Sequence, residues 1–236
     1  MGNNYFRFKH FTVNQKESAF RVGTDGVLLG AWADVSGKTR ILDIGTGTGL
    51  IALMLAQRCA ASVTAIEPDI RSFREASENI KQSKWSERIS IENCSLQNFS
   101  GHDKSFDLIV TNPPYFIDSL KNPDPSKSVA RHNDSLTHKD ILEGADRLLT
   151  DEGELQLIMP YEEGQKFLSL AREKGFYPAD ILNIRPAPDS EIKRLILSFS
   201  RKEKHFSERF MTIDKGKRHD FTDEYIALTK DFYLRF

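Results

Sequence analysis

Short apolar runs and longer helix-like segments alternate along the chain from residue 40 to about residue 174. The apolar runs predict strands near residues 40–44, 62–66, 88–92, 106–111 and 153–158. The segments between and after them predict helices near residues 49–57, 71–83, 136–149 and 161–174. Alternation of this kind is typical of a parallel, doubly wound α/β sheet.

The last part of the chain breaks this alternation. Residues 176–185 and 193–200 both have the composition of strands, and only a short segment with Pro186 and Pro188 separates them. Because this connection has no room for a crossover helix, we expect an antiparallel pair. We predict a single α/β domain over residues 1–236, with a doubly wound, seven-stranded sheet that ends in this hairpin. Its expected parts are an N-terminal extension that packs on the core, the core itself and a basic C-terminal extension, at residues 1–39, 40–200 and 201–236.

A glycine-rich loop follows the first of the predicted parallel strands. Asp43 lies two positions before the first of three glycines, Gly45, Gly47 and Gly49, and a helix-like segment follows them. A strand, a glycine turn and a helix N-terminus form a corner where backbone N–H groups can approach a ligand. The next strand ends at Glu67, 18 residues after Gly49, where a carboxylate can accept hydrogen bonds from ribose hydroxyls. NAD-binding corners look alike, but the G-x-G-x-G spacing after an acidic residue favours S-adenosylmethionine.

The most informative motif is Asn112-Pro113-Pro114-Tyr115, directly after the predicted strand 106–111. A planar amine, such as that of adenine or a carboxamide, must pyramidalise before its nitrogen can attack a methyl group. The Asn112 side-chain oxygen and the Pro113 carbonyl can accept its two N–H groups. The prolines stiffen the loop, and the Tyr115 ring can stack on a flat substrate. Taken alone, the tetrapeptide also fits an ordinary proline turn at the end of a strand.

Composition describes an ordinary globular protein of 236 residues, 28% of them charged and 39% hydrophobic. There is no run of 18 apolar residues and no charged-then-apolar leader, so we expect no membrane span and a cytoplasmic protein. Cys59 and Cys94 lack CxxC spacing, and two free thiols fit a reducing compartment. The histidines are scattered, so we expect no metal. We favour a monomer.

The net charge of −1 hides an uneven distribution. Residues 193–218 hold nine Lys/Arg against three acidic residues, and residues 1–21 hold four against one. Basic ends suit a polyanionic substrate that is held at the periphery, although a solvated charged surface is the alternative. The polar stretch 118–135 is a candidate substrate loop. The candidate phosphate contacts are Arg131, His132, Lys193 and Arg194.

With these motifs in place, the chain resembles the bacterial tRNA adenine-N(6) methyltransferases, which modify the adenine 3′ of the anticodon in a valine tRNA. The similar segments extend beyond the motifs that all methyltransferases share and cover nearly the whole chain: residues 6–9, 11–13, 22–33, 56–58, 85–89, 195–199 and 225–234. The resemblance implies a Rossmann-like methyltransferase sheet, S-adenosyl-L-methionine as cofactor and tRNA as substrate.

The resemblance also implies roles for individual residues. Asp43 would shape the glycine loop, whose three glycines admit the methionine part of the cofactor, and Glu67 would bind the ribose hydroxyls. Ser95 and Leu96 would bound the adenine pocket, although many methyltransferases have an acidic residue there. The residues that would hold the target base are Asn112, Pro113 and Tyr115.

Three alternatives stay open. Methylation of a glutamine amide in a protein such as a release factor uses the same tetrapeptide. Such enzymes usually carry a helical domain before the glycine motif, whereas only some 40 residues precede Asp43. A DNA adenine methyltransferase would need a target-recognition domain that the sequence does not indicate. A non-catalytic RNA-binding protein of the same fold would need neither Asp43 nor Asn112.

Overall fold

A computed structural model describes residues 3–18, 20–114, 136–217 and 219–236. Three candidate site residues, Tyr115, Arg131 and His132, lie outside the described residues, as does the candidate substrate loop 118–135. Their predicted roles therefore stay predictions.

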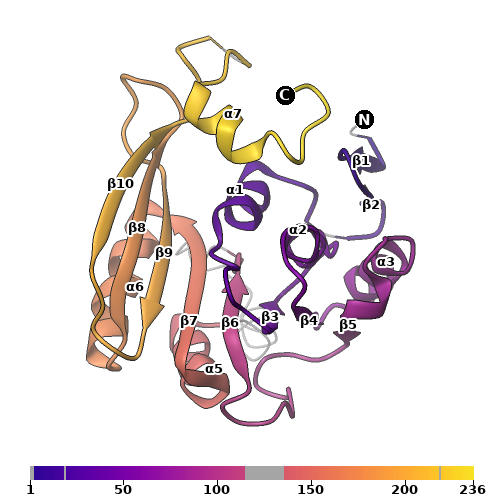
Figure 1. Cartoon of the computed structure of the whole chain (residues 1–236), viewed down its shortest axis with the longest axis vertical. Helices are drawn as coiled ribbons and strands as arrows, with labels where there is room; N and C mark the ends of the chain where they lie inside the picture. Colours follow the sequence, from indigo (N-terminus) through magenta and orange to yellow (C-terminus); the bar gives the residue numbers. More distant parts are fainter. Residues whose placement is uncertain (1–2, 19, 115–135, 218) are drawn as a thin grey trace, which may run out of the picture.

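One eight-stranded sheet forms the centre of the protein, in the order β10-β8-β9-β7-β6-β3-β4-β5 (Figure 1). Strands β3 to β7 pair in parallel, while β9 runs antiparallel to both β7 and β8. The doubly wound α/β sheet with a terminal antiparallel pair is thus confirmed. The strands are β3 (Arg40–Ile44), β4 (Ser62–Ile66), β5 (Ile89–Glu92), β6 (Phe106–Thr111), β7 (Leu149–Pro160), β8 (Tyr177–Arg185), β9 (Arg194–Ser200) and β10 (Ser207–Thr212).

The eighth strand, β10, is absent from the sequence prediction and pairs in parallel with β8 at the edge of the sheet. Of its six residues only Met211 is buried, so it lacks the apolar pattern that marks the inner strands. The sheet therefore exceeds the predicted seven strands by one, and the additional strand comes from the segment expected to form a basic extension.

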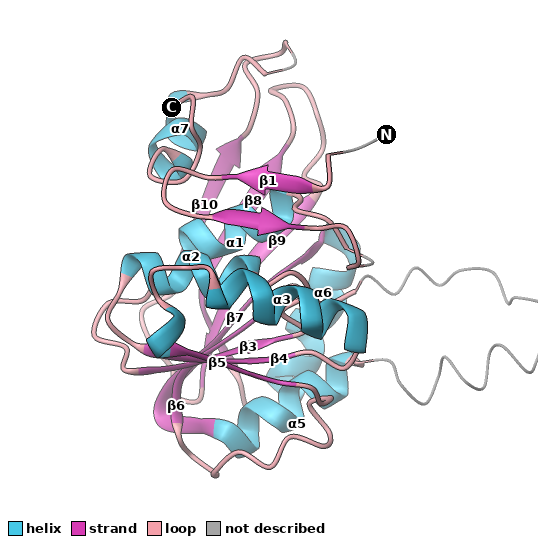
Figure 2. Ribbon diagram, turned by 90° about the vertical axis from the view of Figure 1, so that its right-hand side faces the viewer, coloured by secondary structure: helices cyan, strands magenta, loops and turns pink. Residues whose placement is uncertain are grey.

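Helices cover both faces of the sheet (Figures 1 and 2). Helices α1 (Thr24–Trp32), α2 (Leu50–Arg58) and α3 (Ile70–Lys81) lie on one face, and α5 (His138–Leu148) and α6 (Tyr161–Glu173) lie on the other. Successive residues of a strand point to opposite faces of the sheet, so the protein has one hydrophobic core on each face. Ile41 packs in the core on the face of α1, α2 and α3, and Leu42 packs in the core on the face of α5 and α6. A short helix, α7 (Asp223–Thr229), and a 3₁₀ turn, η1 (Ser86–Arg88), complete the described helices.

The N-terminal residues form a separate hairpin of β1 (Tyr5–Arg7) and β2 (Thr12–Asn14) over α2 and α3 (Figure 2). The Asn79 side chain on α3 accepts a hydrogen bond from the Asn14 N–H and donates one to the Asn14 carbonyl, both 2.9 Å long. The Lys9 N–H donates to the Phe232 carbonyl at 2.8 Å. Both chain ends are thereby held on the helical face that carries α2.

Candidate active site

A cavity of about 660 Å³ opens where β3, β4 and β6 end. In this kind of sheet, ligands bind beyond the carboxyl ends of the strands at the point where the strand order reverses, which here is β3. Eight of the predicted site residues, from segments far apart in the sequence, line this one cavity: Gly45, Gly47, Glu67, Ser95, Leu96, Asn112, Pro113 and Arg194.

The three glycines of the loop have different surroundings. All three have positive φ, with values of 69°, 57° and 82° at Gly45, Gly47 and Gly49, so an L side chain would strain each of them. A Cβ added at Gly45 or Gly47 would meet no atom within 4 Å, whereas at Gly49 it would lie 3.5 Å from the Ala76 Cβ. Gly45 and Gly47 therefore leave room for a ligand, while Gly49 starts α2 and packs against α3.

Asp43 lies behind the glycine loop, is hydrogen-bonded to it and does not line the cavity. Its side chain is fully buried, and Oδ2 accepts hydrogen bonds from the Thr46 hydroxyl at 2.6 Å and the Ala52 N–H at 3.1 Å. Burial raises the pKa of Asp43 to about 7, against the lowering effect of these two bonds. The contacts join β3, the loop and α2.

Glu67 connects the end of β4 to the glycine loop. One carboxylate oxygen accepts the Gly47 N–H at 2.9 Å, and the other accepts the Asp69 N–H at 3.0 Å. Burial raises the pKa of Glu67 although both hydrogen bonds lower it. An ionised carboxylate can accept about four hydrogen bonds, so each oxygen can still accept one from a ligand.

The turn after β4 depends on a residue for which sequence reasoning found no role. The Asn93 side-chain amide donates to the carbonyls of Glu67 at 2.7 Å and Pro68 at 3.1 Å. This contact joins the loop after β5 to the end of β4. Ser95 and Leu96 follow on the cavity wall, where Leu96 is buried against α5. That Ser95 bounds the pocket for the adenine of the cofactor stays a prediction.

Asn112 and Pro113 form the acceptor side of the cavity, directly after β6. The Thr111 hydroxyl donates to the Ile44 carbonyl at 3.0 Å and so joins the end of β6 to the end of β3. The start of α1 also lies near this loop: a Cβ added at Gly26 would lie 4.0 Å from Asn112 Nδ2 and only 3.0 Å from Leu50 Cδ2. Gly26 thus permits α1 to pack closely against the start of α2, beside the acceptor loop.

An exposed aromatic ring at the cavity was also missed. Phe20 lines the cavity with 66% of its surface exposed. The segment before it is held by the buried Glu75 carboxylate on α3, which accepts the N–H groups of Lys16, Glu17 and Ser18. No local pattern could indicate this, because the carboxylate lies nearly 60 residues further along the chain.

Arg194 reaches the cavity from β9, and its Nε donates to the Asp25 carboxylate of α1 at 2.9 Å. Lys193 does not line the cavity, and its Nζ donates to the Glu191 carboxylate at 2.8 Å. The predicted phosphate contacts of both residues stay predictions.

Among the curated proteins similar to this chain are two full-length relatives with the same name. The chain is 45% identical over 240 residues to the tRNA1(Val) (adenine(37)-N6)-methyltransferase of Trichodesmium erythraeum, with 100% of each chain covered. It is 44% identical over 237 residues to the enzyme of that name from Bacteroides fragilis strain YCH46, again with 100% of each covered. The chain belongs to this methyltransferase family.

A family model also matches the chain, and two solved structures share its fold. The family model described as Methyltransferase small domain matches residues 22–173. A predicted O-methyltransferase from Agrobacterium tumefaciens has the same fold, with a TM-score of 0.69 and 20% identity over 88% of this chain and 96% of that one. Pyrococcus horikoshii TYW2 in complex with MeSAdo has a TM-score of 0.60 and 18% identity over 86% and 74%.

For a member of a tRNA-methyltransferase family, the basic segment 193–218 is a candidate RNA surface, but its positive charge is largely compensated. Acidic residues outside this segment pair with five of its cations. These pairs are Arg201–Asp146, Lys202–Glu152, Lys204–Glu154, Arg209–Asp180 and Lys215–Asp223. A charge count along the sequence therefore overstates the positive potential of this segment.

Within the described ranges, no group of three or more His, Cys, Asp or Glu side chains could hold a metal ion. No helix among them is long and apolar enough to cross a membrane.

Proposed function

We propose that this protein transfers a methyl group from S-adenosyl-L-methionine to the exocyclic N6 of an adenine in the anticodon region of tRNA, with a valine tRNA as the expected substrate. The observation that carries the proposal is that Asn112 and Pro113 open into the same cavity as the glycine loop and Glu67. The names of the full-length relatives, tRNA1(Val) (adenine(37)-N6)-methyltransferase, support the same reaction. A cytoplasmic location and a monomeric state are parts of the same proposal.

The residues on the β3 and β4 side fit the cofactor. Gly45 and Gly47 leave their ligand side open, and the Glu67 carboxylate can accept two ribose hydroxyls in addition to its two backbone donors. Ser95 and Leu96 lie where the adenine would be enclosed. When bound, the cofactor supplies an electrophilic methyl group on its sulfonium.

Asn112 and Pro113 act on the acceptor. The Asn112 side-chain oxygen and the Pro113 carbonyl each accept one N–H of the adenine amine, so that the nitrogen pyramidalises and directs its lone pair at the methyl group. The N–C bond forms as the C–S bond breaks. The nitrogen then carries a positive charge and loses a proton to water, so no general base with a shifted pKa is required. Position and orientation supply most of the acceleration.

The substrate adenine must leave its stack to enter the cavity. An unpaired anticodon loop allows this at a lower unstacking cost than a duplex. Tyr115 is proposed to stack on the base. Arg194 and Lys193, with Arg131 and His132, are proposed to contact phosphates near it.

The test is methylation of a valine tRNA transcript, followed by digestion and mass spectrometry of its nucleosides. We expect one N6-methyladenosine per transcript, located 3′ of the anticodon. A transcript with guanosine at that position is the matched control and should stay unmodified. Equal incorporation into both transcripts would overturn the proposed target.

A further inference from the structure

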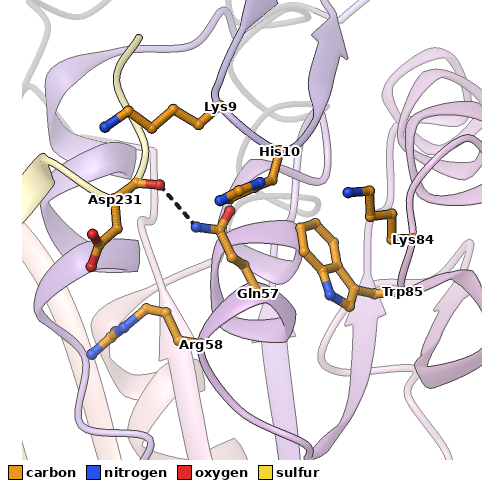
Figure 3. A pocket seen from close by; sticks show the side chains of 7 residues that line it. All are labelled: Lys9, His10, Gln57, Arg58, Lys84, Trp85 and Asp231. Atoms are coloured by element: carbon orange, nitrogen blue, oxygen red, sulfur yellow. Dashed lines mark hydrogen bonds between the residues drawn. The ribbon is translucent and has the colours of Figure 1, made fainter. Parts of the chain in front are cut away.

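A second cavity of about 780 Å³ lies at the opposite end of α2 from the glycine loop. The turn between β1 and β2, the end of α2, the segment after α3 and the segment after α7 converge on it (Figure 3). The nine residues of α2 separate the two cavities by about 13 Å. The lining residues are Lys9, His10, Gln57, Arg58, Lys84, Trp85 and Asp231, none of which lines the cofactor cavity.

Two of the cations in this cavity hold its walls together. Lys9 Nζ donates to the carbonyls of Lys230 at 2.6 Å and Phe236 at 2.8 Å. An Arg58 guanidinium nitrogen donates to the carbonyls of Gly30 at 2.9 Å and Ala33 at 2.7 Å. These contacts join the N-terminal hairpin, the C-terminal segment, α1 and α2. They account for the presence of Lys9 and Arg58 without any ligand.

Lys84 and His10, in contrast, do not hold the walls of the cavity together. Both are exposed, and their side chains make no hydrogen bond or ion pair with any residue that the structure describes. The carbonyls at the end of α2 do not require them, because Arg88 donates to the Ala56 carbonyl at 2.8 Å and the Cys59 carbonyl at 2.9 Å. The cavity thus holds three Lys/Arg side chains against one carboxylate, Asp231.

Trp85 gives the cavity a rigid aromatic wall beside Lys84 (Figure 3). Its ring is half-buried and meets the buried Phe11 ring edge to face, with centroids 5.9 Å apart and an interplanar angle of 76°. Because the ring packs against Phe11 and the hydrophobic core, it is prepared to contact a flat ligand at little cost in side-chain entropy.

We propose that this cavity binds a phosphate of the tRNA backbone outside the anticodon loop, with Lys84 and His10 at the phosphate and Trp85 against the adjoining ribose or base. The inference rests on the proposed function and deepens it. A cationic cavity with an aromatic wall matches the chemistry of a nucleotide unit. A free nucleotide has the same chemistry, but the proposed function already brings an RNA to the cavity at the other end of α2, about 13 Å away.

The test is to reverse the charge of Lys84, whose side chain forms no polar contact that stabilises the described part of the fold. Lys84→Glu removes one proposed phosphate contact, so it should weaken tRNA binding at 0.1 M salt by about eightfold and flatten the slope of log K against log salt by about one unit. Affinity for S-adenosylmethionine and the rate at saturating tRNA should stay unchanged. The matched control is Arg172→Glu on α6, an exposed cation on the opposite face of the sheet whose side chain, like that of Lys84, makes no hydrogen bond or ion pair with any residue that the structure describes. Equal effects of the two changes would overturn the site.

A fluorescence experiment distinguishes a phosphate of the tRNA backbone from that of a free nucleotide. The chain has two tryptophans, so Trp32→Phe leaves Trp85 as the only indole reporter. Titration with tRNA should quench it, and millimolar AMP should not. Quenching by AMP at lower concentrations than by tRNA would assign the cavity to a free nucleotide and contradict the proposal. If the wild type fails to methylate tRNA, the proposed function itself fails, whereas normal methylation with an unchanged Lys84→Glu variant rejects only this second site.

Discussion

Replacement of Glu67 by alanine should weaken cofactor binding far more than it slows the chemistry. The carboxylate is buried at the cavity wall and accepts the N–H groups of Gly47 and Asp69. Its remaining lone pairs are proposed to accept two ribose hydroxyls. A hydrogen bond to a charged group contributes about 1.5–3 kcal/mol, so the loss of two costs at least about 3 kcal/mol. This corresponds to an increase of roughly 100-fold in the Kd for S-adenosylmethionine.

Isothermal titration measures this Kd, and single-turnover methylation at saturating cofactor measures the chemistry. A ribose contact is made equally in the ground and transition states, so KM should rise while kcat changes little. Glu92→Ala is the control, because Glu92 ends the neighbouring strand β5, is exposed and does not line the cavity. A Kd for Glu67→Ala within threefold of the wild-type value would refute the ribose role.

The pH dependence of binding provides an independent check on Glu67. Burial raises its pKa, while ribose hydroxyls would donate to its charged form and lower the pKa again. Cofactor affinity should therefore fall as the pH falls through the raised pKa. The Glu67→Gln variant has no titratable group at this position, so it should bind the cofactor weakly and its affinity should not fall in this way with pH. A wild-type affinity with the same pH dependence as that of Glu67→Gln would argue against the charged carboxylate as the ligand.

Three further predictions concern two residues that line the same cavity, Asn112 and Cys94, and Asp43, which supports its glycine loop. Asn112→Ala should lower the single-turnover rate by about 10²–10³ while cofactor affinity stays within a few-fold, and a near-normal rate would remove Asn112 from the mechanism. Asp43 has a folded pKa of about 7 against 3.8 without burial, so folding retains a proton that the unfolded chain releases between these values. The free energy of unfolding of the wild type, relative to Asp43→Asn, should thus fall from pH 4 to pH 7, and urea titrations that show the reverse trend would contradict the raised pKa. Cys94 lines the cavity and Cys59 does not, so S-adenosylhomocysteine should slow alkylation of Cys94 only; equal protection of both thiols would be inconsistent with this position.

The parts of the fold that were predicted correctly have strong local signals. The parallel strands are short, mainly apolar runs, and the glycine loop and the Asn-Pro-Pro motif follow two of them. Because parallel strands end at the same edge of the sheet, motifs 65 residues apart had to meet there, and Gly47 and Asn112 line one cavity. The short proline-containing connection also predicted the antiparallel pair β8 and β9 correctly.

The features that were missed depend on contacts between distant segments. Strand β10 has one buried residue and is defined by its backbone pairing with β8. The charge of the C-terminal segment is compensated by acidic residues that lie elsewhere in the chain, such as Asp146. The second cavity is built from four segments between Lys9 and Asp231. No periodicity or spacing within a single segment carries this information.

The most direct test of the central claim is methyl incorporation from labelled S-adenosylmethionine, measured in parallel with a valine tRNA transcript and with a purified release factor. The wild-type protein should label the tRNA at the adenine 3′ of the anticodon and leave the release factor unlabelled, and Asn112→Ala should label neither. Incorporation into the protein substrate but not into the tRNA would contradict the proposed function.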